Sequence, residues 1–274
     1  MPPAIGVIGH VEHITLGRVA RLPRAGDIAH VTDLHVIAGG GGGVAFFQLA
    51  RSSAELHLFT AFGDDDAARV VEDQVRTTRA HVHAVRREQP HTRDVAMIDP
   101  EGDRTIVVIG EPLHPRADDA LPWEILDRLD AVFFTAQDPA LLARCRRAKR
   151  VVVAARRRDC IIASGIEVDA IVGSIADPRE RATRGDYPVP PRALVMTDGA
   201  RGGSVETAAG EARFATPKVD HVVGSYGAGD SFAGALTYFL AAGDDVLAAA
   251  SQATRYGAAV LSSIEPLSAQ AALP

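Results

Sequence analysis

The sequence has only two cysteines, Cys145 and Cys160, and their spacing matches neither a CxxC motif nor a metal-ligand set. Two isolated thiols exclude a disulfide scaffold and are typical of a reducing compartment, so we expect a cytoplasmic protein. The ten histidines lack HExxH or a similar spacing, so the sequence predicts core or surface positions for them and no metal site. No apolar run approaches the length of a membrane span, and no charged segment followed by an apolar one opens the chain, so we expect no membrane partner.

A strong excess of basic charge is also absent. The formal net charge is −6, and residues of both signs are interspersed along the chain. This distribution offers no basic stripe that could neutralise nucleic-acid phosphates, and it favours a small molecule as the partner. With 274 residues and 47% hydrophobic content, the chain can bury a large core. We therefore expect one α/β domain over residues 1–274, with a small appendage.

Strand and helix patterns alternate along much of the sequence. After Asp130, the apolar segments AVFFT, RVVVAA and DAIVGS are separated by helical patterns, and AIGVIG opens the chain as a further buried strand. Such repeats predict a mostly parallel sheet covered on both faces, with ligands at the carboxyl ends of the strands. Alternating polarity over Leu22–Val36 predicts an exposed strand, and the stretches Asp94–Ile98 and Thr105–Ile109, which flank the turn-rich DPEGDR, predict a hairpin.

The most informative stretch is Val222–Leu240, VVGSYGAGDSFAGALTYFL. It predicts an apolar strand end, a glycine turn and a helix that begins almost at once. The amides of Gly227, Ala228 and Gly229 could then stabilise an anion together with the helix dipole. A carboxylate at Asp230 would repel a bound phosphate, but it would serve as a base that deprotonates an attacking hydroxyl. The alternative is a structural turn in which Asp230 only caps the helix.

GAGDSFAGAL after an extended VDHVV segment closely resembles the DTTGAGDxF signature of the ribokinase-like, PfkB family of carbohydrate kinases. The resemblance extends with gaps from residue 5 to about residue 261. It implies a three-layer α/β/α sandwich with a mostly parallel central sheet and a small β lid, formed by residues 12–38 and 92–110. It also implies ATP and Mg²⁺ as cofactors, and a possible homodimer in which a second subunit protects the exposed lid strands.

Five consecutive glycines, Gly39 to Gly43, precede an apolar helical pattern. Glycines in such number favour a substrate-facing turn over a linker, because a ligand or another backbone must come close. The turn resembles the GGxxxN element of the family, so Gly39, Gly40 and Gly41 are candidates for substrate binding. Val44 occupies the position of the family's asparagine and offers an apolar surface instead.

The family also places an aspartate in the loop after the first strand, where it binds sugar hydroxyls. This sequence has HVEHIT there, and Glu12 is the nearest carboxylate. Glu12 is either a shifted substitute for that aspartate or a solvated loop residue.

On the nucleotide side, Thr197, Gly199 and Gly202 keep the TxGxxG pattern with which the family lines ATP. Ser174 and Asp177 fall where the family has NxxE, a motif tied to magnesium and phosphate. Asp177 could hold a hydrated Mg²⁺ through water, and the alternative is that both residues cap a helix.

Gly224 stands where DTTGAGD has the aspartate that helps to hold a monovalent cation. Glycine offers no such ligand, so we expect weak or absent potassium activation. Together the motifs predict an ATP-dependent kinase that phosphorylates a primary hydroxyl of a sugar or a sugar-like molecule. The alternatives are a nucleoside kinase on the same fold and a relative that binds a small molecule but has lost the chemistry, because Val44, Ser174 and Gly224 depart from the family pattern.

Overall fold

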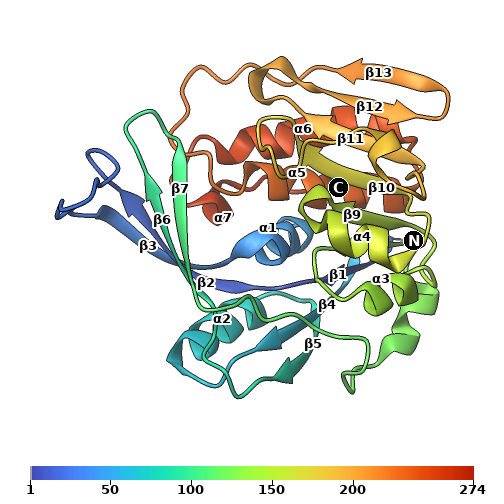
Figure 1. Cartoon of the computed structure of the whole chain (residues 1–274), viewed down its shortest axis with the longest axis horizontal. Helices are drawn as coiled ribbons and strands as arrows, with labels where there is room; N and C mark the ends of the chain where they lie inside the picture. Colours follow the sequence, from blue (N-terminus) through green and yellow to red (C-terminus); the bar gives the residue numbers. More distant parts are fainter. Residues whose placement is uncertain (1) are drawn as a thin grey trace.

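A nine-stranded sheet forms the centre of the computed structural model, which describes residues 2–274 (Figure 1). Its strand order is β13-β12-β11-β10-β9-β8-β1-β4-β5, and neighbouring strands from β11 to β5 run parallel. Only β12 and β13 add antiparallel pairing, at one edge. The strands are β1 (Ala4–Ile8), β4 (Glu55–Phe62), β5 (His81–Arg86), β8 (Ala131–Phe134), β9 (Val151–Ala154), β10 (Ala170–Ser174), β11 (Ala193–Thr197), β12 (Gly203–Thr207) and β13 (Gly210–Phe214).

Helices cover both faces of this sheet. One face packs against α1 (Gly40–Leu49), α2 (Asp66–Arg76), α5 (Ala228–Ala242) and α6 (Val246–Val260). The other face packs against the 3-10 helix η1 (Trp123–Arg128) and two short helices, α3 (Pro139–Cys145) and α4 (Arg158–Ser164). The remaining helical elements are α7 (Pro266–Ala269) and three single 3-10 turns, η2 (Ala155–Arg157), η3 (Arg184–Asp186) and η4 (Gly199–Arg201).

Successive side chains of the central strands point into the two hydrophobic cores on opposite faces of the sheet. In β1, Ile5 and Val7 belong to the core beneath α1 and α5, whereas Ile8 belongs to the core beneath η1 and α3. Side chains alternate across a strand, so a strand buried on both faces is apolar at nearly every position. The predicted three-layer α/β architecture is therefore confirmed, and the apolar runs of the sequence correspond to its central strands.

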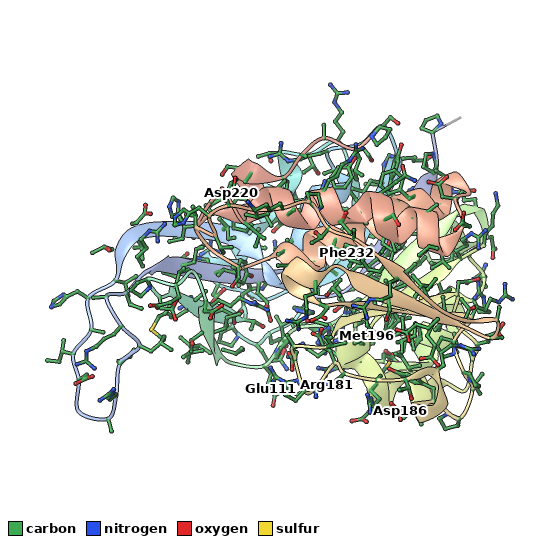
Figure 2. All side chains as sticks on the ribbon, turned by 90° about the horizontal axis from the view of Figure 1, so that it is seen from above. Glu111, Arg181, Asp186, Met196, Asp220 and Phe232 are labelled. Carbon is green, nitrogen blue, oxygen red and sulfur yellow. The ribbon has the colours of Figure 1, made fainter. Side chains whose placement is uncertain are left out.

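A second, four-stranded sheet has the order β3-β2-β6-β7. It consists of β2 (Glu12–Arg18), β3 (Thr32–Gly39), β6 (Arg93–Ile98) and β7 (Arg104–Ile109). The pairs β2/β3 and β6/β7 are antiparallel, and β2/β6 is parallel. Seen from above, these strands extend beyond the main body of the molecule (Figure 2). β2 follows β1 directly and β3 leads into α1, so the second sheet is attached at the edge of the main sheet where the parallel strands end.

Two local expectations were wrong. No strand precedes α5, because residues 215–226 are irregular; this segment is held instead by backbone hydrogen bonds from Val223 to Leu261 (2.8 Å) and from Ser225 to Gly102 (2.9 Å). The glycine run is not a turn before a helix either, since α1 already begins at Gly40. Both cysteines are free and buried. Within residues 2–274 no helix combines the length and apolarity needed to cross a bilayer.

Candidate active site

The N-terminus of α5 presents its first-turn amides without a side-chain cap. Gly227 precedes the helix with φ of 79°, a left-handed conformation that glycine adopts most readily. A Cβ at this position would lie 3.1 Å from both Val44 and Pro266, so packing also favours glycine. Gly229 in the first turn is exposed, and a Cβ there would meet no atom within 4 Å. The amide groups at this helix start are therefore accessible to an anion.

Asp230 lies in the same first turn and is partly buried as a residue. Burial and then the negative charge of Glu180 raise its pKa, while the cationic charges of Arg104, Arg156 and Arg157 act in the opposite direction. A raised pKa makes the carboxylate a stronger base. The influence of Arg104 is informative because this residue comes from β7 of the second sheet, so groups from both sheets act on the same carboxyl group.

The start of α1 lies directly beside Asp230. A Cβ on Gly41 would be 3.3 Å from Asp230 Oδ1 and 3.5 Å from Thr135 Oγ1. Gly40 adopts φ of 75°, and its N–H donates to the buried Tyr226 hydroxyl at 3.0 Å. Two helices with glycine-rich starts thus converge at the end of β8, which is the edge where the central parallel strands terminate.

Other glycines of the run are needed because neighbouring atoms pack closely against their backbone. A Cβ on Gly42 would lie 2.3 Å from the His10 carbonyl oxygen, and one on Gly39 would lie 2.5 Å from Ile14 and 2.7 Å from the Tyr226 hydroxyl. Val44 is fully buried in the apolar cluster beneath the second sheet. Of the residues expected to face a substrate, Gly41 is placed next to Asp230, whereas Val44 is placed in the core and could influence a substrate only through its neighbours.

Glu12 is the first residue of β2 and is only 5% exposed, so the alternative of a solvated loop residue was wrong. Its carboxyl group lies against the glycine run, since a Cβ on Gly40 would be 2.6 Å from Glu12 Oε2. Burial, followed by the charge and hydrogen bond of Asp94, raises the pKa of Glu12 to about 9. Burial also raises the pKa of Asp94, which is 4% exposed. The two groups form a buried carboxyl pair that shares a proton at neutral pH.

Asp94 was missed as a site residue. Its signal in the sequence is its position in β6, where Asp94, Ala96 and Ile98 alternate as inward-facing residues. A carboxylate in the inward register of a strand is unusual, because burial of an unpaired charge is costly.

A second group that the sequence did not reveal consists of His10, His114 and Arg157. The His10 and His114 rings meet edge to face at 5.0 Å, and an Arg157 guanidinium nitrogen lies 3.4 Å from His10 Nδ1. Burial and then neighbouring positive charge hold the pKa of His10 well below its usual range and lower that of His114 to about 3. Within residues 2–274, both ring nitrogens of His114 and Nε of Arg157 have no hydrogen-bond partner, so these buried groups are available to a ligand.

Ser174 is the last residue of β10 and Asp177 lies in the turn that follows, so neither starts a helix. Burial opposes ionisation of Asp177, but the Arg179 N–H and the charge of Arg156 lower its pKa overall. Arg156 also bonds Glu180 at 2.9 Å, and Glu180 accepts the Ser174 N–H at 3.0 Å. Among the neighbouring carboxylates, Glu180 raises the pKa of Asp230 most strongly. Its electrostatic influence on Asp230 is therefore larger than that of Asp177.

The TxGxxG residues lie at the end of β11. Thr197 donates its hydroxyl to the Gly173 carbonyl at 3.2 Å, and Gly199 and Gly202 have φ of 53° and 84°. A Cβ on Gly202 would lie 2.0 Å from the Phe214 carbonyl oxygen, so only glycine fits there. Gly224 is similarly confined, because a Cβ would lie 3.1 Å from the Ser263 carbonyl oxygen.

Asp230 lines neither of two hollows, of about 350 and 330 Å³. The first lies between the second sheet and α2 and is lined by Asp94, and the second lies between α2 and β5. The candidate site is therefore identified from its converging polar groups, which come from the start of α1 and α5 and from the ends of β1, β8 and β9.

Part of the chain matches a known protein family. Residues 159–271 match the family model of the pfkB family carbohydrate kinases. That segment includes Asp177, Thr197 and Asp230. The resemblance that the sequence motifs predicted is thus confirmed. A search of curated proteins found no match.

The whole chain resembles solved structures of this fold. Ribokinase from Thermotoga maritima superposes with a TM-score of 0.79 at 18% identity, over 98% of this chain and 96% of that chain. Ribokinase from Arabidopsis thaliana, solved with ribose and ATP, gives 0.74 at 15% identity, over 98% and 96%. Adenosine kinase from Sinorhizobium meliloti gives 0.75 at 13% identity, over 97% and 96%. The protein therefore has the ribokinase-like fold of these solved structures.

Proposed function

We propose that this protein is an ATP-dependent kinase that transfers a phosphoryl group to a primary hydroxyl of a sugar or a sugar-like molecule. The observation that carries the proposal is the position of Asp230, in the uncapped first turn of α5 and beside Gly41. Phosphoryl transfer requires a base for the attacking hydroxyl and donors that stabilise charge on the transferred group. Both lie in one turn of this chain.

In this proposal Asp230 accepts the proton of the acceptor hydroxyl. Its raised pKa increases its basicity, and the opposing charges of Arg104, Arg156 and Arg157 keep it from being protonated too readily. The amides of Gly227, Ala228 and Gly229 stabilise the developing charge on the phosphoryl oxygens through hydrogen bonds and the helix dipole. The irregular segment before α5 allows this close approach, because it contributes no side chain that caps the helix.

The acceptor would be positioned by groups outside the phosphoryl site. The pair Glu12 and Asp94 can both donate and accept hydrogen bonds because it shares a proton, which suits a hydroxyl group. His114 and Arg157 offer further polar atoms without partners among the described residues. We assign Glu12, Gly39, Gly40 and Gly41 to the acceptor side; Gly39 and Gly40 act by allowing the close packing of Tyr226 and Glu12.

ATP would lie along the ends of β10 and β11, near Thr197, Gly199 and Gly202. Mg²⁺ would neutralise charge on the nucleotide phosphates. Oxygen donors suit this ion, and Asp177 and Glu180 supply carboxylates in the same turn. Because Arg156 pairs with both carboxylates, we assign them contacts to hydrated Mg²⁺ through water and not direct ligation.

The test is a panel of sugars, sugar phosphates and nucleosides incubated with Mg·ATP, with release of ADP and a phosphorylated product measured together. We expect turnover with at least one polyol, and none with Asp230→Asn. Product formation by Asp230→Asn at the wild-type rate would overturn the assignment of the base.

A nucleoside kinase is the second candidate, because the apolar Val44 replaces a polar position of the family motif and the fold also matches an adenosine kinase. Preference for adenosine-like nucleosides over ribose and ketohexoses in the same panel would select it. If ligands raise the melting temperature but no phosphorylated product forms across the panel, the protein is instead a binding relative that has lost the chemistry.

We also propose that two copies pair through the second sheet. Val107, Val108 and Ile109 of β7 are about half exposed, as is Leu34 of the opposite edge strand. Apolar edge strands are usually covered in stable proteins. Analytical ultracentrifugation should find a dimer that Val108→Lys dissociates, and a monomer at all accessible concentrations would contradict this pairing.

A further inference from the structure

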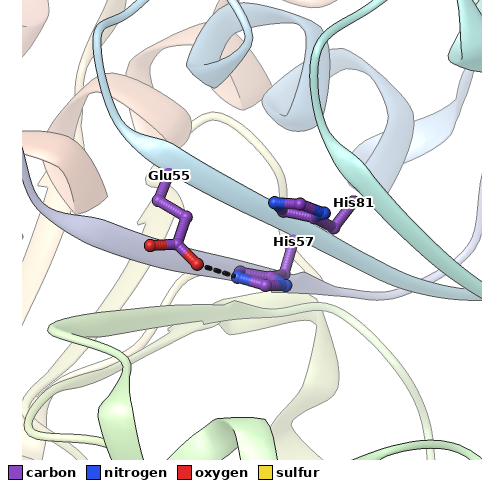
Figure 3. A group of neighbouring side chains, drawn as sticks. All are labelled: Glu55, His57 and His81. Atoms are coloured by element: carbon purple, nitrogen blue, oxygen red, sulfur yellow. Dashed lines mark hydrogen bonds and ion pairs between the residues drawn. The ribbon is translucent and has the colours of Figure 1, made fainter.

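Three potential metal ligands meet at the edge of the main sheet that lies opposite the candidate active site (Figure 3). Glu55 and His57 are two residues apart in β4, so their side chains emerge from the same face of the sheet. His81, the first residue of β5, is paired in register with His57. One carboxylate oxygen and one ring nitrogen from each histidine all lie within 4.8 Å of one another.

One pair of ligand atoms in this cluster already has the spacing of a tetrahedral site. Glu55 Oε1 is 3.0 Å from His57 Nε2, and ligand atoms about 2.0–2.2 Å from a zinc ion are separated by roughly 3.3 Å. The His57 and His81 rings stack with centroids 4.8 Å apart, and the His81 nitrogen lies within 4.8 Å of the other two ligand atoms. A bound ion would therefore have to draw the exposed His81 ring toward them.

His83, one further position along the same face of β5, supports the cluster. Its Nε2 lies 3.1 Å from His57 Nδ1. A His57 whose Nε2 binds the ion would carry its proton on Nδ1 and donate it to His83, as histidine ligands usually do to a neighbouring acceptor.

Glu55 adds a negative charge within the cluster itself. Half-exposed Glu55 and exposed His81 leave the fourth position open to water.

We propose that Glu55, His57 and His81 bind one divalent transition-metal ion of the zinc class, with His83 orienting His57. Imidazole nitrogen with one carboxylate is a donor set that favours Zn²⁺ over Mg²⁺ or Ca²⁺. The ion would link the first residues of the edge strand β5 to those of its neighbour β4. Because these are the starting ends of parallel strands, while Asp230 lies at the finishing ends, the site stabilises the sheet edge and takes no part in phosphoryl transfer.

The spacing in the sequence gives no sign of this site. His57 and His81 are separated by a complete helical crossover through α2, so only the register between β4 and β5 brings them together. The site is independent of the proposed kinase activity.

The experiment uses the full chain without an affinity tag, stripped of metal with a chelator. Zn²⁺ alone is titrated by calorimetry, and Co²⁺ is titrated by visible absorption, in which tetrahedral coordination gives intense bands. We expect one ion per chain, a rise in melting temperature on zinc addition, and no response to Mg²⁺. His81→Gln should weaken zinc binding at least tenfold.

The matched control is His30→Gln, which removes an exposed histidine from the loop between β2 and β3 and should bind zinc like the wild type. His81 is exposed, so His81→Gln should keep the fold, as checked by circular dichroism. The proposal is overturned if wild-type protein binds no stoichiometric zinc, or if His81→Gln binds it as tightly as the wild type does. Neither result would bear on the kinase proposal, whose readout is phosphorylated product.

Discussion

Glycines lie in the first turns of both α1 and α5 at the candidate site, but they have different purposes. In α1, Gly40 and Gly42 are buried because Glu12 and the His10 backbone occupy the space where their side chains would be. In α5, Gly229 is exposed, and a Cβ there would meet no atom within 4 Å. Glycine at a helix start can therefore either permit close packing or leave the backbone accessible to a ligand. The sequence alone does not distinguish these two roles.

The largest effect is expected for Asp230→Asn on the α5 side. Loss of a positioned base typically lowers the rate by about 10²- to 10⁴-fold, whereas the amide keeps the size of the side chain. Steady-state ADP release measures turnover, and ATP binding measured by calorimetry should remain within about threefold of the wild type. A variant that fails to bind ATP would indicate that Asp230 shapes the site and is not only a base.

On the α1 side, Gly42→Ala should destabilise the fold itself. The new Cβ would lie 2.3 Å from the carbonyl oxygen of His10, a backbone atom in the short link between β1 and β2. Overpacking of this kind costs about 1–3 kcal/mol in the free energy of unfolding, measured by urea denaturation. The control is Gly41→Ala, whose Cβ would have no contact closer than 3.3 Å. Equal stability of the two variants would contradict the packing role.

The raised pKa of Glu12 makes the free energy of unfolding depend on pH. Its pKa is raised to about 9, so the folded state holds a proton that the unfolded state releases near pH 4.5. The unfolded chain therefore binds fewer protons between these values, and the free energy of unfolding falls as pH rises from about 5 to 9, by at most about 1.4 kcal/mol per pH unit.

Glu12→Gln should make this decline shallower, as measured by urea denaturation at several pH values. Glu88→Gln, which changes an exposed glutamate, should leave the decline unchanged. If Glu12→Gln and the wild type show parallel curves, the carboxyl pair does not hold the extra proton.

The smallest effect is expected for Gly229→Ala. Its Cβ would meet nothing within 4 Å, and alanine favours a helix over glycine by up to about 1 kcal/mol, so thermal stability should stay equal or rise slightly. Activity should nevertheless fall, by about tenfold, because the methyl group covers amides that stabilise the phosphoryl group. Unchanged activity would show that no ligand approaches this part of the turn.

Much of the fold was predictable because its signals are local. The apolar strands β8, β9 and β10 are separated by short helical patterns, and Asp65 caps α2 through the Ala68 N–H, as its position at the acidic start of that helix predicts. Errors arose where tertiary contacts override local pattern. The apolar segment before α5 is not a strand, because its hydrogen bonds go to Leu261 and to Gly102 in the turn between β6 and β7.

The candidate site was predicted in part. The GAGD turn and the nucleotide glycines are contiguous motifs, so their chemistry is visible in the sequence. Asp94 and Arg157 were missed because they come from β6 and from η2 after β9, and only tertiary packing brings them near Glu12. His10 was missed although it is only two residues from Glu12, because its environment is formed by His114 and Arg157.

The sequence by itself determined an α/β sandwich and a carboxylate in a glycine-led helix start, because strand periodicity, helix caps and short motifs depend on neighbouring residues. The tertiary structure alone decided which distant groups act together, such as the pair Glu12 and Asp94 and the cluster around His57. The physical reason is that burial and charge coupling depend on distance in space, and strand register sets that distance across many residues of chain.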